Sequence, residues 1–195
     1  MQYSAYYVEE NDGAFSASIS RLELEKPADG FVQIKVSHSS LNYKDALSAS
    51  GNKGVTRNYP FVPGIDLAGE ILESSSTDFG IGDKVLATGY KIGMSEFGGF
   101  GEIVHLPAEW VLKMPSNLTF EKAMSYGTAG LTAAACVKKI VDANIKKSLP
   151  ILVSGSTGGV GSVAVGVLSS PVSYTHLRAH ETREDRGLRR LGGKK

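Results

Sequence analysis

The stretch Val153-Ser154-Gly155-Ser156-Thr157-Gly158-Gly159-Val160-Gly161 decides how the C-terminal part of the chain folds. The short apolar run 151–153 precedes the glycines, and a longer apolar segment, 160–168, follows them. This order predicts a strand, a glycine turn and a helix, which together form one βα unit. Backbone N–H groups at the start of such a helix can hold a phosphate anion. Dinucleotide binding is therefore the favoured interpretation, and a purely structural glycine turn is the alternative.

Each glycine of this turn has a predicted purpose. Gly155 takes the tight turn, Gly158 and Gly159 allow a pyrophosphate to approach the backbone, and Gly161 allows the helix to pack closely on the strand. A phosphate-binding P-loop is disfavoured, because no Lys-Ser or Lys-Thr pair closes the motif. The next strand, whose end separates NAD from NADP, is expected to be missing. We expect the pyrophosphate to be bound, largely by backbone N–H groups, at Ser156, Thr157, Gly158, Gly159 and Val160.

The first part of the chain is predicted to be rich in strands. Residues 31–37 alternate apolar and polar side chains, as in a half-buried strand. Further short strands are expected at 65–72, 84–87, 102–106 and 110–113, separated by Gly, Pro, Asn, Asp and Ser. After Pro115 the pattern becomes helical: Thr119 can cap a helix through Met124, and a second helix is expected over 131–141.

The predicted fold class is mixed α/β. Residues 1–120 are assigned to a compact β-barrel-type domain, and 121–170 to the truncated start of a Rossmann domain. Residues 171–195 contain five of the seven arginines, and 172–182 (VSYTHLRAHET) resembles translated sequencing-adapter DNA. We interpret this tail as non-native, with a solvated basic tail or a nucleic-acid arm as the alternatives. One βα unit leaves its helix uncovered, so the chain as written is expected to be poorly folded beyond residue 120 and inactive.

Composition excludes several classes of function. A formal charge of +1 gives no reason to expect nucleic acid or an anionic membrane as a partner. Cys136 is the single cysteine, so an intrachain disulfide and a multi-cysteine metal site are both impossible. The chain shows no secretory signal and no apolar run of membrane length. A cytoplasmic protein is therefore expected.

Four motifs together resemble one known family. They are Ser39 to Asp45 (SSLNYKD), Pro60 to Asp66 (PFVPGID), Gly127 to Ala133 (GTAGLTA) and the glycine turn. Taken in order, they resemble the acrylyl-CoA reductase group, also called YhdH/YhfP-like quinone oxidoreductases, of the medium-chain dehydrogenase/reductase superfamily. The resemblance implies a GroES-like catalytic domain, then a Rossmann domain, then a return to the catalytic domain. This chain would be slightly more than half of such a protein, which we expect to be a homodimer.

The resemblance also implies chemistry without a metal. Zinc-dependent relatives place a cysteine where this chain has Asn42, and Gly-His-Glu where it has Gly64-Ile65-Asp66. We therefore expect no metal site, since catalytic zinc needs about three protein ligands. His38 and His105 are interpreted as strand or loop side chains. The implied reaction is hydride transfer from NADPH to an activated C=C of a small molecule such as acrylyl-CoA, an enone or a quinone.

Five positions are carried over as candidate site residues. Asn42 is expected to face the nicotinamide, with a turn residue as the alternative. Tyr43 is expected to pack on the nicotinamide or to donate its hydroxyl. The alternative is that its ring only packs within the loop. Asp66 orients Lys44 or Asn42, or else bonds to backbone. Lys44 is expected to contact ribose or phosphate, with an ordinary exposed lysine as the alternative. Thr128 is expected to hold the cofactor. A zinc alcohol dehydrogenase and a non-catalytic dinucleotide-binding relative remain the competing hypotheses.

Overall fold

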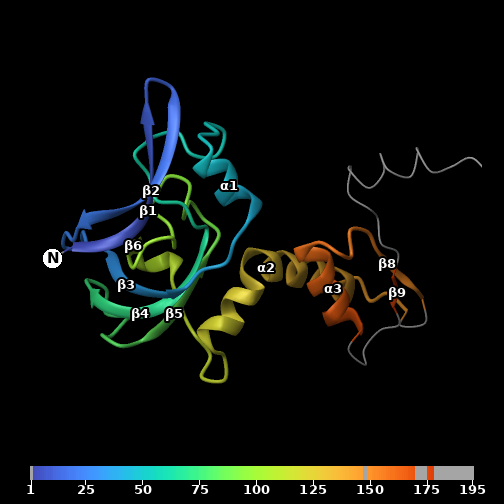
Figure 1. The fold of residues 1–195 in the computed structure, drawn as a ribbon. Coiled ribbons are helices and arrows are strands. Elements are labelled where there is room, and N and C mark those ends of the chain that lie inside the picture. The colour runs from blue at the N-terminus through green and yellow to red at the C-terminus, as the bar shows by residue number, and fades with distance from the viewer. Residues whose placement is uncertain (1, 147–148, 170–174, 178–195) are drawn as a thin grey trace, which may run out of the picture. The chain divides into compact units, whose positions relative to one another are not determined.

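The computed structural model describes residues 2–146, 149–169 and 175–177 (Figure 1). The chain divides into two compact units, Met1–Thr128 and Ala129–Lys195. The first unit holds nearly all the strands, and the second holds most of one long helix and a small βαβ arrangement.

A β-hairpin opens the first unit. Strands β1 (Gln2–Asn11) and β2 (Ala14–Glu23) pair antiparallel over their whole length. Asp12 and Gly13 form the two-residue loop, with φ angles of 51° and 81°. Both positive values fit the turn whose twist matches the flanking strands. The hairpin was not predicted from the sequence, although Asp-Gly between alternating residues is a typical signal for it.

The main sheet of the first unit has five antiparallel strands in the order β6-β3-β4-β5-β7. Its strands are β3 (Phe31–His38), β4 (Asp66–Ser74), β5 (Lys84–Thr88), β6 (Ile103–Pro107) and β7 (Leu112–Lys113). All five predicted strands are present, and a 3-10 helix, Ala108–Trp110, takes the start of the last one. The expected barrel is corrected, because the paired strands of the described residues form an open sheet and a separate hairpin.

The helices differ more from expectation. Helix α1 (Tyr43–Ala49) was not predicted. The two helices expected after Pro115 are both present, as the two halves of α2 (Phe120–Asp142) on either side of a non-helical Gly127. The Oγ1 of Thr119 accepts a hydrogen bond from Lys122 N–H at 3.2 Å, which confirms the predicted cap. No helix of the described residues has both the length and the apolar character needed to cross a bilayer.

The second unit contains the predicted βα unit. Strand β8 (Ile151–Val153) is followed by α3 (Gly159–Ser169), as the sequence indicated. The expectation that no further strand follows was wrong, because β9 (Thr175–Leu177) pairs in parallel with β8. The rest of the predicted non-native tail, residues 171–174 and 178–195, lies outside the described residues.

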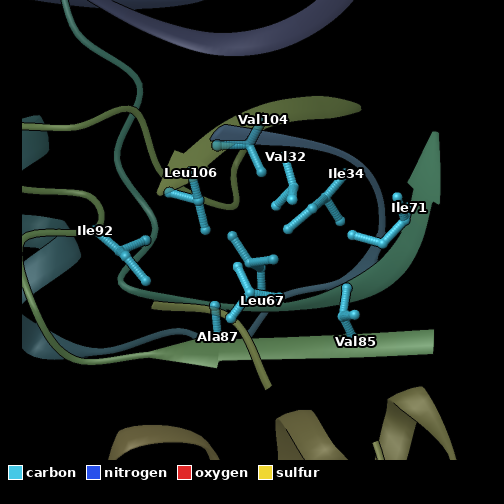
Figure 2. Close-up of a cluster of buried hydrophobic side chains, with 10 residues drawn as sticks. Val32, Ile34, Leu67, Ile71, Val85, Ala87, Ile92, Val104 and Leu106 are labelled. Atoms are coloured by element: carbon cyan, nitrogen blue, oxygen red, sulfur yellow. The ribbon is translucent and has the colours of Figure 1, made fainter. Parts of the chain in front are cut away.

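The hydrophobic core of the first unit lies against the five-stranded sheet (Figure 2). Side chains from β3, β4, β5 and β6 converge there with Ile92 and Val111. Leu67 of β4 belongs to this core. The next residue, Ala68, packs on the other side of the strand with Ala123 and Met124 of α2. Both faces of β4 are therefore covered at its start, and residues 66–69 are all buried. The ten core residues are Val32, Ile34, Leu67, Ile71, Val85, Ala87, Ile92, Val104, Leu106 and Val111.

A matched pair of leucines tests this core. Leu106 is 0% exposed and Leu112 is 61% exposed, and both lie in strands of the main sheet. We expect Leu106→Ala to lower the free energy of unfolding by about 2–5 kcal/mol, because it leaves a cavity. Leu112→Ala should cost less than about 1 kcal/mol. Urea unfolding followed by the fluorescence of Trp110, which packs against the core, measures both. Equal losses would contradict this account of the core.

Candidate active site

A fully buried carboxylate, Asp66, lies at the first position of β4. Its Oδ2 accepts hydrogen bonds from Ser40 Oγ at 2.5 Å, from Asn42 Nδ2 at 2.9 Å and from the backbone N–H of Thr128 at 2.9 Å. Its Oδ1 accepts from Thr128 Oγ1 at 2.6 Å and from Thr88 Oγ1. Five hydrogen bonds therefore reach one carboxylate within the part of the chain that the structure describes.

The two threonines are also close to each other. Thr88 Oγ1 and Thr128 Oγ1 lie 2.8 Å apart. Each hydroxyl has one hydrogen to donate. When both hydrogens go to Asp66, the contact between the two threonine oxygens is a close approach without a hydrogen bond of its own. The carboxylate therefore holds both hydroxyl hydrogens in fixed directions.

The surroundings of Asp66 lower its pKa. Burial acts to raise the pKa of this carboxyl, but the donors Ser40, Thr128 and Thr88 outweigh it, so the net direction is below the ordinary value. Hydrogen bonds to the charged form stabilise that form. Asp66 is thus an ionised acceptor at neutral pH that orients the groups around it.

Gly127 explains how Thr128 reaches the carboxylate. Its φ of 48° and ψ of −148° interrupt α2, and a Cβ built there would lie 2.5 Å from both Asp66 Oδ2 and Ser40 Oγ. Only glycine fits this close approach and this backbone conformation without strain. The break brings the next N–H, that of Thr128, onto Asp66.

A second buried carboxylate, Asp45, supports the same region from α1. Its Oδ2 accepts from the backbone N–H of Asn42 at 2.8 Å, and its Oδ1 accepts from the backbone N–H of Ile65 at 2.9 Å. Burial raises the pKa of Asp45; its backbone hydrogen bonds oppose that rise and the charge of Asp66 adds to it. Asp45 thus fixes the backbone at or beside both Asn42 and Asp66.

The structure brings three of the predicted site residues of the first unit together and separates two from them. Asn42, Asp66 and Thr128 form one network, so both alternatives considered for Asp66, contact with Asn42 and with backbone, are present at once. Tyr43 is 81% exposed at the start of α1, and Lys44 is exposed beside it. Among the described residues, Lys44 has no hydrogen bond or ion pair, so the suggested contact with Asp66 is absent.

Three members of the network were missed as site residues. Ser40 and Asp45 lie within the SSLNYKD motif, in which only Asn42, Tyr43 and Lys44 were predicted to be site residues. Thr88 ends β5 directly opposite Asp66 in the strand register. Only knowledge of the β4 and β5 pairing would have found Thr88, because nothing in the local sequence distinguishes it.

The glycine turn of the second unit has the expected backbone. Gly155 has a φ of 64°, and Gly158 N–H donates to Gly155 O at 3.0 Å. A Cβ at Gly161 would lie 2.1 Å from Gly155 O, so this glycine allows α3 to approach the turn itself, where the prediction named the strand. Ser156 is half-buried, whereas the other candidate pyrophosphate-binding residues, Thr157, Gly158, Gly159 and Val160, are exposed. Gly158 N–H is used within the turn, so an anion would be held by other N–H groups at the start of the helix.

Comparison with known proteins finds one matching domain family and several similar proteins. Residues 28–116 match the alcohol dehydrogenase GroES-like domain family. The chain is 41% identical over 165 residues to the Escherichia coli protein named probable acrylyl-CoA reductase AcuI, covering 84% of this chain and 51% of that protein. It thus spans about half the length of the curated relatives it matches.

Solved structures agree with this match. The YhdH oxidoreductase of Salmonella enterica, in complex with NADP, has a TM-score of 0.85 and 36% identity, covering 97% of this chain and 59% of that one. The Bacillus subtilis protein YhfP, with NAD bound, has a TM-score of 0.87 and 34% identity, covering 98% and 59%. The chain is thus similar to oxidoreductases of the YhdH/YhfP type over the part of their length that it spans.

Substitution of the central carboxylate tests the network. We expect Asp66→Asn to lower the free energy of unfolding by about 2 kcal/mol or more. The NH₂ group of the new asparagine would replace one carboxylate oxygen, so the donors that now bond to that oxygen would lose their acceptor. Asp78→Asn, at an exposed aspartate, is the matched control and should unfold like the wild type. Urea unfolding at neutral pH measures the difference. A wild-type midpoint for Asp66→Asn would contradict the proposed network.

The lowered pKa of Asp66 predicts the pH dependence of that difference. A carboxyl with a folded-state pKa below its unfolded value stabilises the fold above the unfolded value, here 3.8, and this contribution is lost as pH falls through the folded-state pKa. The gap in unfolding free energy between wild type and Asp66→Asn should therefore shrink below about pH 3.8. Urea unfolding at a series of pH values follows the gap. A constant gap would mean that Asp66 does not ionise as described.

Proposed function

We propose that this chain provides the catalytic domain and the start of the dinucleotide-binding domain of a zinc-independent, NADPH-dependent reductase. Its substrate would be a small molecule with an activated C=C, such as an acrylyl thioester, an enone or a quinone. The observation that carries the proposal is the saturation of Asp66 by donors at the position where zinc-dependent relatives place metal ligands.

The chemistry of the donor set argues against a zinc ion at this position. A carboxylate offers about four lone-pair directions, and five hydrogen bonds already use those of Asp66. The amide nitrogen of Asn42 donates to Asp66, which is the role of a hydrogen-bond donor and not of a zinc ligand. No group of three or more His, Cys, Asp or Glu side chains in the described residues could hold a metal. Hydrogen bonding would therefore take the place of a metal ion in this site.

The glycine turn fits a nicotinamide dinucleotide. The exposed Gly158 and Gly159 carry no Cβ, and the first N–H groups of a helix have no acceptor within the helix itself. We assign pyrophosphate binding to Ser156, Thr157, Gly158, Gly159 and Val160. The bound cofactor would supply hydride to the substrate. The relatives with bound cofactor hold NADP in one case and NAD in the other, and the choice of NADPH rests on the family resemblance.

Asn42 is the residue that we assign to the reacting end. One N–H of its amide is fixed by Asp66, which leaves the second to donate to a carbonyl oxygen. Hydride addition at the β-carbon of the substrate gathers negative charge on that oxygen, and a proton then completes the reduction at the α-carbon. A donor held in place before the reaction stabilises this charge without reorganisation. Asp66 is thus a positioning residue in the proposed mechanism.

The other candidate residues receive supporting roles. Tyr43, exposed at the start of α1, would pack on the nicotinamide or donate its hydroxyl. Lys44 would contact ribose or phosphate, and Thr128 would hold the nicotinamide end. We further propose that the whole protein is a cytoplasmic homodimer. The exposed thiol of Cys136, the single cysteine, suits a reducing compartment, and the dimer follows from the resemblance.

A reductase assay tests the function. NADPH consumption is measured with acrylyl-CoA and with a neutral enone, using the 195-residue chain and the longest reading frame found on resequencing its source across residues 169–195. We expect turnover from the longer protein and none from the 195-residue chain. Asn42→Ala should lower kcat by roughly a hundredfold, as removal of a preorganised donor does. Asn117→Ala, an exposed asparagine outside the site, should leave kcat unchanged.

Two outcomes would overturn the proposal. NADPH binding without turnover on any enone, quinone or enoyl-CoA would make the protein a non-catalytic dinucleotide-binding relative. Stoichiometric zinc in the purified protein, found by metal analysis, would make it a zinc alcohol dehydrogenase. Reductase activity from the 195-residue chain would contradict the separate expectation that this chain is poorly folded beyond residue 120 and inactive.

A further inference from the structure

A pocket beside strand β6 lies apart from the candidate active site. Its volume is about 280 Å³, near the lower end of the range for small-molecule sites. The lining includes the aromatic residues Tyr3, Phe31 and Phe97, together with Glu96 and His105, and we call it the aromatic pocket. Among the described residues, no Lys or Arg lines it. The aromatic pocket therefore offers apolar surface and hydrogen-bond acceptors, without a positive charge.

The strand register separates this pocket from the Asp66 network. Phe31 is the first residue of β3, and its neighbour Val32 pairs with Ser74, the last residue of β4. Asp66 is the first residue of β4, so it lies at the other end of the same strand pair. The nine residues of β4 span roughly 27 Å. A ligand against Phe31 is therefore remote from the proposed reaction.

His105 supplies a hydrogen-bond acceptor. Its Nε2 lies 3.2 Å from Oε1 of the buried Gln33, and Nε2 carries the hydrogen because a carbonyl oxygen only accepts. Burial lowers the pKa of His105, against the opposing charges of Glu25 and Glu73, so at neutral pH the ring is neutral and Nδ1 is an acceptor. Nδ1 has no partner within the described residues, where every fully buried side-chain nitrogen or oxygen is hydrogen-bonded. Nδ1 is therefore accessible to a donor.

Glu96 supplies a negative charge on a backbone that is held in place. Its N–H donates to Lys91 O at 3.2 Å, and its carbonyl accepts from Gly93 N–H at 2.9 Å. The residue is half-buried, and its carboxylate forms no hydrogen bond or ion pair within the part of the chain that the structure describes. Partial burial weakens the hydration of a carboxylate, so pairing with a cation is favourable here.

The aromatic residues of the pocket are also held in place. Phe97 contacts the rings of Tyr7 and Phe61 edge-on, with centroids 6.4 and 5.5 Å from its own. The N–H of Phe31 donates to Ala28 O at 3.0 Å. The face of an aromatic ring attracts a cation, and ordering before binding lowers the entropic cost. Rings, carboxylate and acceptor thus favour the same kind of ligand.

We propose that the aromatic pocket binds a small organic ammonium ion that has N–H groups and an apolar body, such as an arylalkylamine. The ammonium would donate to Nδ1 of His105 and pair with the carboxylate of Glu96, while the apolar body packs on the rings. An anion is disfavoured, because Glu96 would repel it and no Lys or Arg among the described residues lines the pocket. The inference is independent of the proposed function, since this ligand would be an effector and not the substrate.

Titration with matched amines tests the inference. Phenethylamine, which is charged at neutral pH, and the neutral 2-phenylethanol are titrated into the purified protein and followed by ligand-observed NMR. Phenethylamine should bind about tenfold more tightly. Glu96→Gln should weaken its binding about tenfold, whereas Glu121→Gln, which removes an exposed carboxylate from α2, should leave affinity within about twofold. Phe31→Leu, which keeps apolar surface without the ring, should weaken binding about threefold. Urea unfolding checks that each variant is folded.

The outcomes decide the inference without any turnover. Equal affinity for phenethylamine and 2-phenylethanol would overturn it, because the charge would then play no part. Unchanged affinity in a folded Glu96→Gln variant would place the amine elsewhere and would also overturn it. A loss in Glu96→Gln that Glu121→Gln does not share would support it, whatever the reductase assay finds, since the titration needs neither NADPH nor a reducible substrate.

Discussion

The buried charge of Asp66 is the constraint on which the rest of the first unit depends. A carboxylate without solvent is costly unless donors surround it, and four residues from separate parts of the chain supply those donors. Satisfying the charge fixes Ser40 and Asn42 before α1, Thr88 at the end of β5, and Thr128 at the break in α2. The same contacts that stabilise the fold therefore arrange the site.

How much could be predicted from the sequence depended on how local each signal was. The strands, the cap at Thr119 and the βα unit follow from short-range pattern, and the structure confirms them. The open sheet, in place of a barrel, depends on which strands pair, and no local pattern reports that. Thr88 shows the same limit within the site, since its importance comes from lying opposite Asp66 in β4.

Resemblance and geometry contributed different things to the candidate site. The resemblance aligned Asn42 and Asp66 with metal ligands of zinc-dependent relatives, without indicating which contacts these two residues make. The geometry supplies those contacts, which form a hydrogen-bonded network centred on the carboxylate of Asp66. Lys44 illustrates a position that the motif nominated and the geometry left exposed. The sequence motifs indicated which segments form the site, and the long-range hydrogen bonds showed which side chains interact there.

The closeness of Gly127 to Asp66 and Ser40 also limits which amino-acid substitutions this region can accept. Substitution of Asp66 would leave the donors Ser40, Thr88 and Thr128 without their acceptor in a buried place. A different arrangement at this position would require several coordinated replacements, each unfavourable alone. The network thus constrains sequence change, and its members are expected to vary together, because a single replacement leaves buried polar groups unpaired.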